Sequence, residues 1–288
     1  MSHSKILIQL DTDPQVSSFD SVVAVDAGAD QLLHYPGVSC QNVVPLVHGA
    51  MFTRGPAALQ NTALFIGGSD IVVGEAVLQE VLKTFFGPVR VSVMLDSGGC
   101  NTTATAAVLS AAAHVPLANT RTLVLAATGP VGARVCRLLA GQGADVLAGS
   151  RSEDRARGIC KHIKDVLPNA NIAPAQIDTA DRLAAALDGV QILISAGAEG
   201  VTLLPAAVRE AAGDLRVVID LNAVPPLGVE GIEAQDCAKP YGSAVCYGAI
   251  GVGGSKMKIH KEAIKRLFNS NDLVLDAEEI FKIGELIA

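Results

Sequence analysis

Six residues, "ATGPVG" at 127–132, have the types and spacing of a loop that holds a pyrophosphate. The apolar run 122–128 leads into them and the helical pattern 131–141 follows, which is the order of a dinucleotide-binding unit. In such a unit the second glycine admits the phosphates, the third lets the helix pack on the strand, and the helix N-terminus favours negative charge. Ala127 replaces the first glycine, so the alternative is a tight turn that binds nothing. The predicted contacts are Thr128, Gly129, Pro130, Val131 and Gly132.

The end of the next apolar run, 144–150, selects between the two nicotinamide cofactors. NAD sites place a carboxylate here for the ribose 2′-hydroxyl, whereas this chain has Ser150, Arg151 and Ser152. A guanidinium and two hydroxyls suit a 2′-phosphate, so we predict NADP, with NAD use left open. The alternative is that Arg151 is a solvated surface charge.

Two later strand ends complete the predicted cofactor site. Ser195, Ala196 and Gly197 follow the apolar run from residue 190, and their small side chains suit the passage of a nicotinamide ribose. Asn222 follows the run 216–221 and could bond the carboxamide or a substrate. Asp220, two residues earlier, is equally well explained as a turn residue that bonds local backbone.

Strands and helices must alternate to place these loops at one edge of a sheet. Helical patterns separate the apolar runs, so we predict an α/β protein with two doubly wound domains, the second a Rossmann-type NADP-binding domain. A proline and a polar stretch interrupt the pattern near 114–122. We place a substrate domain at 1–118 and 257–288 and the dinucleotide domain at 119–256. The C-terminal helices are assigned to the first domain because it otherwise lacks closing helices. The predicted strands are 5–10, 62–68, 89–95, 122–128, 144–150, 190–197 and 216–221.

Composition narrows the class of protein. The 288 residues are 50% hydrophobic, and the net charge of −7 argues against a nucleic-acid surface. The six cysteines form no CxxC pair and have no histidine at metal-ligand spacing, so we expect reduced thiols, no metal site and a cytoplasmic location. We expect neither a signal peptide nor a membrane span, because no apolar run is long enough.

Seven segments resemble the bacterial methylene-tetrahydromethanopterin dehydrogenases of one-carbon metabolism. The resemblance implies a two-domain enzyme that oxidises the methylene group of a reduced pterin carrier to the methenyl form and passes a hydride to NADP. It also implies a homo-oligomer with its active site in the cleft between the domains. The matching segments are "FDSVVAVDAGAD" (19–30), "FIGGSD" (65–70), "FFGPVRVSVMLDSGGCNTT" (85–103), "TGPVGARV" (128–135), "AVPPLGVEGIEA" (223–234), "YGAIGVGGSKMKIHKEAI" (247–264) and "DAEEIFKI" (276–283).

The implied reaction directs attention to carboxylates, because hydride loss from a carbon between two nitrogens leaves a cation and moves no proton. A carboxylate accepts the N–H donors of a pterin edge and favours the developing positive charge. We select Asp20 and Asp96 for this role, with Asn101 in the loop that follows Asp96. For each aspartate the alternative is a helix cap or a solvated charge.

The glycine-rich run "GAIGVGGSK" at 248–256 first suggests a phosphate loop. It has no G-K-[ST] sequence and no clear strand before it, so it fails the Walker pattern. We interpret Gly251, Gly253 and Gly254 as a close crossing between domains beside the nicotinamide, with a helix that begins near Lys256. Lys256 is the one predicted catalytic residue: it orients the substrate by bonding the pterin carbonyl, or it approaches a cofactor phosphate.

Three alternatives remain at this point. One is a methylene-tetrahydrofolate dehydrogenase. Another is an NADP-dependent enzyme of the shikimate dehydrogenase type, for which we find no convincing Lys/Asp acid–base pair. The third is an NADP-binding sensor without activity.

Overall fold

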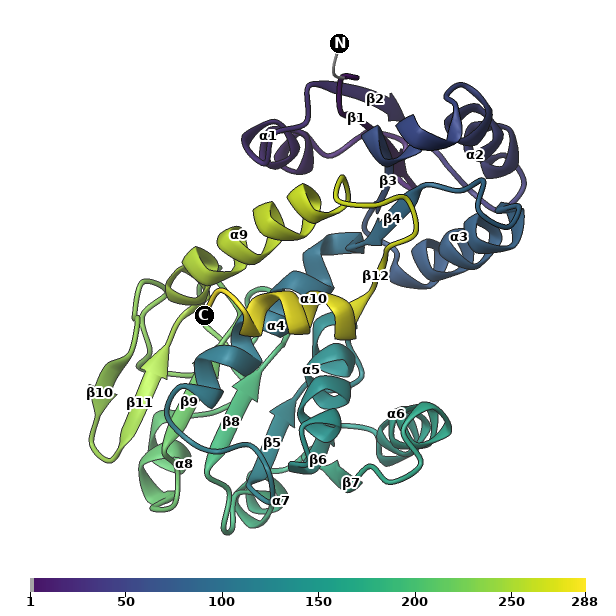
Figure 1. Cartoon of the computed structure of the whole chain (residues 1–288). Coiled ribbons are helices and arrows are strands. Elements are labelled where there is room, and N and C mark those ends of the chain that lie inside the picture. The colour runs from purple at the N-terminus through teal and green to yellow at the C-terminus, as the bar shows by residue number, and fades with distance from the viewer. Residues whose placement is uncertain (1–2) are drawn as a thin grey trace. The chain divides into compact units, whose positions relative to one another are not determined.

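A computed structural model describes residues 3–288 of the chain and divides into two compact units (Figure 1). Unit 1 comprises the chain up to Thr102 together with Met257–Ile287, and unit 2 comprises Thr103–Lys256. Both divisions fall inside helices, α4 (Cys100–Ala112) and α9 (Ala249–Arg266). The boundary that we place at 118–119 from sequence follows the end of α4.

Unit 1 is built on a five-stranded parallel sheet of order β12-β4-β3-β1-β2. The order changes direction between β1 and β3, which makes that gap the switch point of a doubly wound sheet. All six residues of β3 are buried, and the side chains of α2 and α3 pack on the same core. Its elements are β1 (Ile6–Asp11), α1 (Ser18–Asp26), β2 (Gln31–Tyr35), α2 (Val43–Phe52), η1 (Pro56–Asn61), β3 (Thr62–Gly67), α3 (Ile71–Thr84), β4 (Ser92–Leu95), η2 (Ser97–Gly99), β12 (Val274–Leu275) and α10 (Ala277–Glu285).

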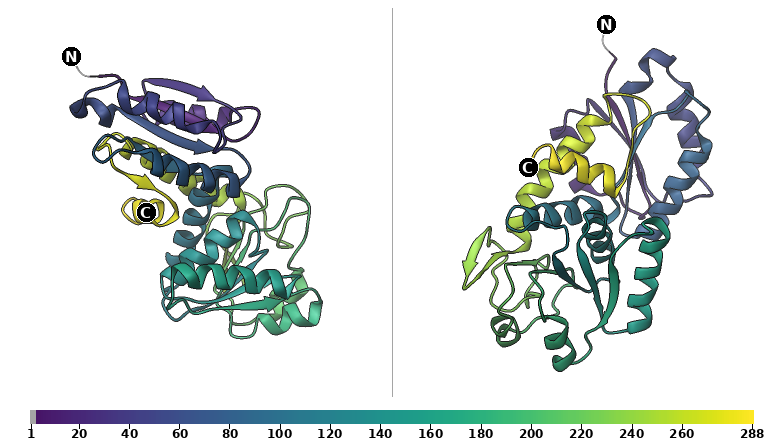
Figure 2. Two further views of the ribbon diagram at one scale, coloured as in Figure 1. Left: turned by 90° about the vertical axis from the view of Figure 1, so that its right-hand side faces the viewer. Right: turned by 60° about the horizontal axis from the view of Figure 1, so that its bottom comes forward.

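Unit 2 contains a seven-stranded sheet of order β10-β11-β9-β8-β5-β6-β7, flanked by helices (Figure 2). Only β10 is antiparallel. From β7 through β11 the order is that of the dinucleotide-binding fold, with its switch point between β5 and β8. Its elements are β5 (Arg121–Leu125), α5 (Pro130–Gly141), β6 (Asp145–Ser150), α6 (Glu153–Val166), β7 (Ile172–Gln176), α7 (Ala180–Ala186), β8 (Ile192–Ser195), α8 (Ala206–Ala211), β9 (Val217–Asp220), β10 (Lys239–Tyr241) and β11 (Ala244–Tyr247).

The predicted fold class is confirmed in both sheets, and so is the return of the C-terminus to the first domain. Val274 and Leu275 of β12 pair with Val93 and Met94 of β4. The predicted start of the last long helix is wrong, because α9 begins at Ala249 and so includes the glycine-rich run. Between residues 3 and 288 we find no helix whose length and hydropathy would let it span a bilayer.

Candidate functional site

The loop between β5 and α5 has the geometry of an anion cradle. Gly129 is the N-cap of α5 in an extended conformation, with φ −81° and ψ 168°, and it makes no side-chain capping bond. Pro130 follows at the first helical position, where its missing N–H costs nothing. The first N–H groups of a helix have no partner inside it, so this end of the 12-residue α5 can receive a pyrophosphate.

Gly132 keeps α5 close to the strand that precedes it. A Cβ on Gly132 would lie 2.4 Å from the carbonyl oxygen of Ala126 and 2.9 Å from the Cα of Ala127. Ala126 takes the left-handed backbone conformation, with φ 56°. Because the left-handed position of this turn is residue 126, the Cβ of Ala127 is accommodated as a buried methyl, although the motif usually has glycine there. The loop therefore fits a dinucleotide phosphate with the residues present.

The end of β6 presents one exposed cation between two structural serines. Ser150 is buried, and its Oγ accepts a hydrogen bond from the N–H of Ser152 at 3.2 Å. Ser152 caps α6 by accepting from the N–H of Arg155 at 3.4 Å. Arg151 is exposed, and its guanidinium makes no hydrogen bond or ion pair within residues 3–288. Its charge is therefore available to an anionic ligand.

The ends of β8 and β9 are joined by a buried carboxylate. Ser195 and Asp220 are register partners, and both are buried. Asp220 accepts from the N–H of Val229 at 2.9 Å and from that of Asn222 at 3.2 Å, as the turn alternative predicts. Burial raises the pKa of Asp220, against the lowering effect of these bonds and of the Ser195 hydroxyl. Asp220 thus holds the 221–229 loop against the sheet.

Asn222 and Gly197 also serve the local fold. The side chain of Asn222 donates to the carbonyl of Pro226 at 3.2 Å and accepts from the N–H of Val224 at 2.9 Å. A Cβ on Gly197 would lie 2.6 Å from Cδ1 of Leu203, so a larger residue there would have to displace that side chain. Ala196, between Ser195 and Gly197, is partly buried.

In unit 1, Asp20 lies at the switch point of the sheet. It occupies the first turn of α1, where its N–H donates to the Oγ of the N-cap Ser17 at 3.2 Å. The buried Asp11, at the end of β1, holds Ser17 in turn by accepting from its N–H at 3.0 Å. A Cβ built on Gly67, the last residue of β3, would lie 3.7 Å from Oδ2 of Asp20. The partly buried Asp20 carboxylate is thus set between the carboxyl ends of β1 and β3, where doubly wound sheets bind ligands.

Asp96 has the geometry of a helix cap, which is the alternative weighed above. Its Oδ1 accepts from the N–H groups of Asn101 and Thr102 at 2.9 and 3.1 Å, and its Oδ2 accepts from the Thr102 hydroxyl at 2.6 Å. The side chain is 1% exposed, as is that of Asn101. Asn101 donates to the carbonyl of Leu95 at 2.7 Å and to Asp276, the N-cap of α10, at 3.0 Å. Together they join the end of β4 to two helix starts.

The glycines at 248–254, just before and within the start of α9, divide into two kinds. A Cβ on Gly248 would lie 2.1 Å from the carbonyl oxygen of Glu233, and one on Gly251 would lie 1.9 Å from that of Asp236. The interpretation of Gly251 as part of a crossing between domains is therefore wrong, because it packs on backbone of its own unit. Gly253 and Gly254 have no atom within 4 Å of such a Cβ. Lys256 is partly buried and lies well inside the helix rather than at its start.

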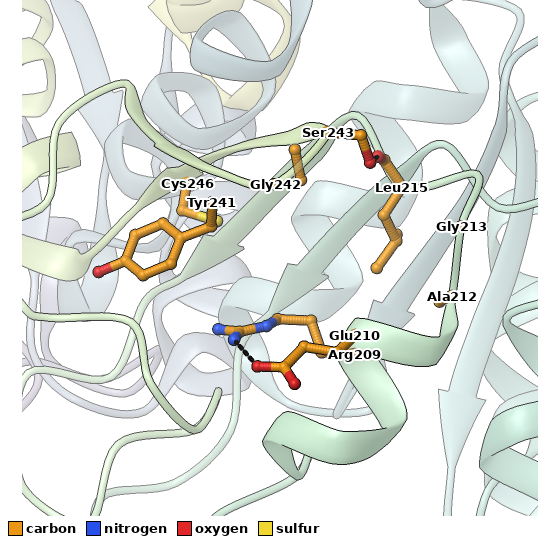
Figure 3. Close-up of a pocket in the computed structure, with 10 residues that line it drawn as sticks. Arg209, Glu210, Ala212, Gly213, Leu215, Tyr241, Gly242, Ser243 and Cys246 are labelled. Carbon is orange, nitrogen blue, oxygen red and sulfur yellow. Dashed lines mark hydrogen bonds and ion pairs between the residues drawn. The ribbon is translucent and has the colours of Figure 1, made fainter.

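A cavity of about 350 Å³ in unit 2 lies away from these strand ends (Figure 3). Leu215 and Ser243 line it and precede β9 and β11, so it opens at the amino ends of the strands. Arg209, on its wall, donates to the carbonyl of Glu230 at 2.9 Å and pairs with Glu210 at 3.1 Å. The cavity is therefore separate from the candidate nucleotide loop.

Phe19, the residue before Asp20, was not among the site residues predicted from sequence. Phe19 is 50% exposed, and its ring lies 6.4 Å from that of His260. The helix that carries both Phe19 and Asp20 was not predicted. The available signal was their adjacency in the segment 19–30, which carries part of the family resemblance.

Comparison with known proteins finds relatives that are similar to this protein over almost the whole chain. A family model described as "Methylene-tetrahydromethanopterin dehydrogenase, N-terminal" matches residues 18–98. "Bifunctional protein MdtA" of Methylorubrum extorquens is 44% identical over 286 residues, 99% of each chain. From the same organism, "NAD(P)-dependent methylenetetrahydromethanopterin dehydrogenase" is 30% identical over 293 residues, 98% of each chain. Among solved structures, shikimate 5-dehydrogenase of Listeria monocytogenes aligns with a TM-score of 0.58 at 14% identity, covering 100% of this chain and 98% of its own, which is a likeness of fold.

Proposed function

The chain belongs to the methylene-tetrahydromethanopterin dehydrogenase family, and from this we propose that it oxidises a methylene-tetrahydropterin carrier to the methenyl form with NADP⁺ as hydride acceptor. The relatives confirm the family resemblance stated from the seven segments. The observation that carries the proposal is the length of the relationship. At 44% identity it extends over 99% of both chains and so covers both units.

The proposed reaction does not require a general acid or base from the protein. A C–H bond of the methylene carbon breaks, its electron pair leaves with the hydrogen as hydride, and the positive charge spreads over the two flanking nitrogens. Bound NADP⁺ supplies the hydride acceptor. The protein must hold two reactants in register and exclude water.

The cofactor residues follow from unit 2. The N-terminus of α5, from Gly129 to Gly132, would hold the pyrophosphate, because its N–H groups face a loop with no side-chain cap. Arg151 would bind the 2′-phosphate of NADP with its exposed guanidinium. We expect Arg151→Ala to raise the KM for NADP far more than the KM for NAD. An equal rise for both cofactors contradicts the assignment.

The substrate residues follow from unit 1 and α9. Asp20 would accept N–H donors of the pterin, and its charge would favour the cationic product. Lys256 would orient the substrate by donating a hydrogen bond to a carbonyl of the pterin. We do not propose it as a base, because a lysine cation beside the cationic product would be repelled. We propose that Asp96 and Asn101 act indirectly, as the cap and brace that fix the end of β4.

The decisive experiment is an assay of the purified full chain for NADPH formation. Its arms are methylene-tetrahydromethanopterin, methylene-tetrahydrofolate and shikimate, each with NADP⁺ and with NAD⁺. Reduction of NADP⁺ with a methylene-tetrahydropterin supports the proposal. NADP binding without reduction by either pterin overturns it and favours a sensor, whereas turnover of shikimate alone favours a different dehydrogenase.

We also propose that the protein is a homo-oligomer of the cytoplasm. The solvent face of α1 carries Val22 and Val25, which are 62% and 57% exposed, beside the unpaired edge of β2 with Leu33 at 43%. Such an apolar face favours burial against another copy. Six free cysteines suit a reducing compartment. Light scattering tests the first proposal: a monomeric mass contradicts it.

A further inference from the structure

Phe19 is held as a supported aromatic face in a chain that has few aromatic residues. The sequence contains seven Phe, three Tyr and no Trp. The Phe19 ring is tilted by 38° against His260 at 6.4 Å, and His260 is stacked at 5.7 Å and 20° on Phe65 of β3. His260 and Phe65 are buried, whereas Phe19 is 50% exposed. The three rings thus form a series from the core of unit 1 to its surface, in which the two buried rings support that of Phe19.

The surroundings of Phe19 are those of a binding site for a flat heterocycle. It precedes Asp20 on α1, at the carboxyl ends of β1 and β3. At the same end of the sheet, α3 follows β3 and carries Val72 and Val73 in its first turn, which are 70% and 37% exposed. Phe19 therefore offers an exposed apolar face directly beside a carboxylate, and sites for small ligands combine apolar surface with few polar groups in this way.

We propose that Phe19 is the face on which the pterin ring of the substrate stacks, while the adjacent Asp20 accepts hydrogen bonds from the polar edge of that ring. This inference rests on the proposed function. The pterin bicycle is flat, with π-faces for stacking and N–H donors along one edge. Residues adjacent on a helix point about 100° apart, so Phe19 and Asp20 approach a ligand from neighbouring directions. Stacking of a heterocyclic base on an aromatic side chain changes affinity by about ten- to a hundredfold.

Phe52 provides a matched control in the same unit. It is 64% exposed, and its ring lies 5.5 Å from that of His48. It ends α2, however, from which the chain leads through η1 into β3, and so it lies toward the amino ends of the strands. The same substitution at the two positions removes the same ring from the same kind of neighbour.

The first test is steady-state kinetics of the full chain. We expect Phe19→Ala to raise the KM for the methylene-tetrahydropterin about tenfold or more, with the KM for NADP and the mass by light scattering unchanged. Phe19→Tyr restores a pterin KM near that of the parent, and Phe52→Ala leaves it unchanged. A pterin KM that is unaltered in Phe19→Ala overturns the proposal. So does a fall in mass that accompanies the loss, because Phe19 would then serve assembly.

The second test is binding without turnover. Because the chain has no Trp, the variants Phe19→Trp and Phe52→Trp each carry a single indole as a fluorescent probe. We titrate each with the carrier lacking its methylene group. Quenching confined to Phe19→Trp supports the proposal, and equal quenching in both variants overturns it. If the parent protein oxidises neither pterin, the proposed function is wrong. If the parent is active but the Phe19 variants behave like the parent, only the stacking proposal is wrong.

Discussion

The substitution Gly132→Ala tests whether the approach of α5 to its strand builds the nucleotide site. The added Cβ would meet the carbonyl oxygen of Ala126 at 2.4 Å and the Cα of Ala127 at 2.9 Å. Contacts between carbon and carbonyl oxygen lie near 3.3 Å or beyond, so the helix start must move by about 1 Å. Both obstacles are backbone, which cannot rotate away. Overpacking of this kind costs about 1–3 kcal/mol, against about 1 kcal/mol gained by replacing glycine in a helix.

The effect on the cofactor should exceed the effect on stability. A movement of about 1 Å displaces the N–H groups that would face the pyrophosphate, and a hydrogen bond to a charged group contributes about 1.5–3 kcal/mol. Loss of one such bond weakens NADP binding by about ten- to a hundredfold. Isothermal titration with NADP⁺ measures the dissociation constant, and thermal unfolding of the same preparation measures the stability.

Gly141→Ala is the internal control, because it makes the same change at the other end of α5. There a Cβ would meet only Cδ1 of Leu167, at 3.8 Å, which is ordinary contact. We expect unchanged NADP affinity and equal or slightly higher stability. A folded Gly132→Ala protein that binds NADP⁺ like the parent would refute the reasoning, and so would equal losses of affinity in the two variants.

Three further predictions follow from the described geometry. Asp96→Asn should lower the free energy of unfolding by about 1–2 kcal/mol and leave the KM values for pterin and NADP unchanged, whereas Asp20→Asn should raise the pterin KM. Denaturant melts measure the first effect and steady-state kinetics the second. A raised pterin KM in Asp96→Asn would mean that Asp96 binds the substrate. Gly253→Ala and Gly254→Ala should each stabilise α9 by about 1 kcal/mol and so raise the melting temperature. If Gly253 contacts the cofactor, Gly253→Ala should also bind NADP more weakly, whereas Gly254→Ala should not. Because burial raises the pKa of Asp220, its contribution to stability is fully present below pH about 4 and lost as the pH rises through the folded pKa. The stability of the parent relative to Asp220→Asn should therefore fall as the pH rises, and a flat or rising difference in urea titrations contradicts this sign.

Three of the strands predicted from sequence are buried on both faces. β3, β8 and β9 are continuous apolar runs in which every residue is buried, so the pattern and the structure agree. β2 and β7 were missed for a physical reason. Both are edge strands, β2 is mostly exposed, and β7 contains Pro174, which is tolerated only where a strand lacks a second neighbour.

Among the helices that were missed or shortened, α1 and α9 have sequences that do not favour helix in isolation. α1 has buried Val23 and Ala24 and exposed Val22 and Val25, so no apolar stripe marks one face. The start of α9 is rich in glycine, which disfavours a helix by about 1 kcal/mol per residue relative to alanine. Tertiary packing overrides this preference. Inside the helix, Gly251 lies so close to the backbone of Asp236 that no larger residue fits there.

The candidate site was predictable where chemistry depends on spacing and unpredictable where it depends on partners. The loop at 127–132 and the serines around Arg151 could be found because backbone turns and helix caps have local signals. Asp20 and Asp96 are equivalent candidates in sequence. Only the hydrogen bonds of Asp96 to Asn101 and Thr102 distinguish them, and these depend on where β4 ends relative to α4.

The buried carboxylates bear on the kind of reaction that the protein can perform. Asp11, Asp96, Asp220 and Asp236 are each at most 6% exposed, and each accepts at least one hydrogen bond from a backbone N–H group. A general acid or base must reach a substrate proton and change its charge during turnover, whereas these four carboxylates are held by the turns and helix starts that they stabilise. A hydride transfer that leaves a delocalised cation requires no such group. The charge that the proposed reaction does need falls to the partly buried Asp20, whose carboxylate is not among those enclosed in the core.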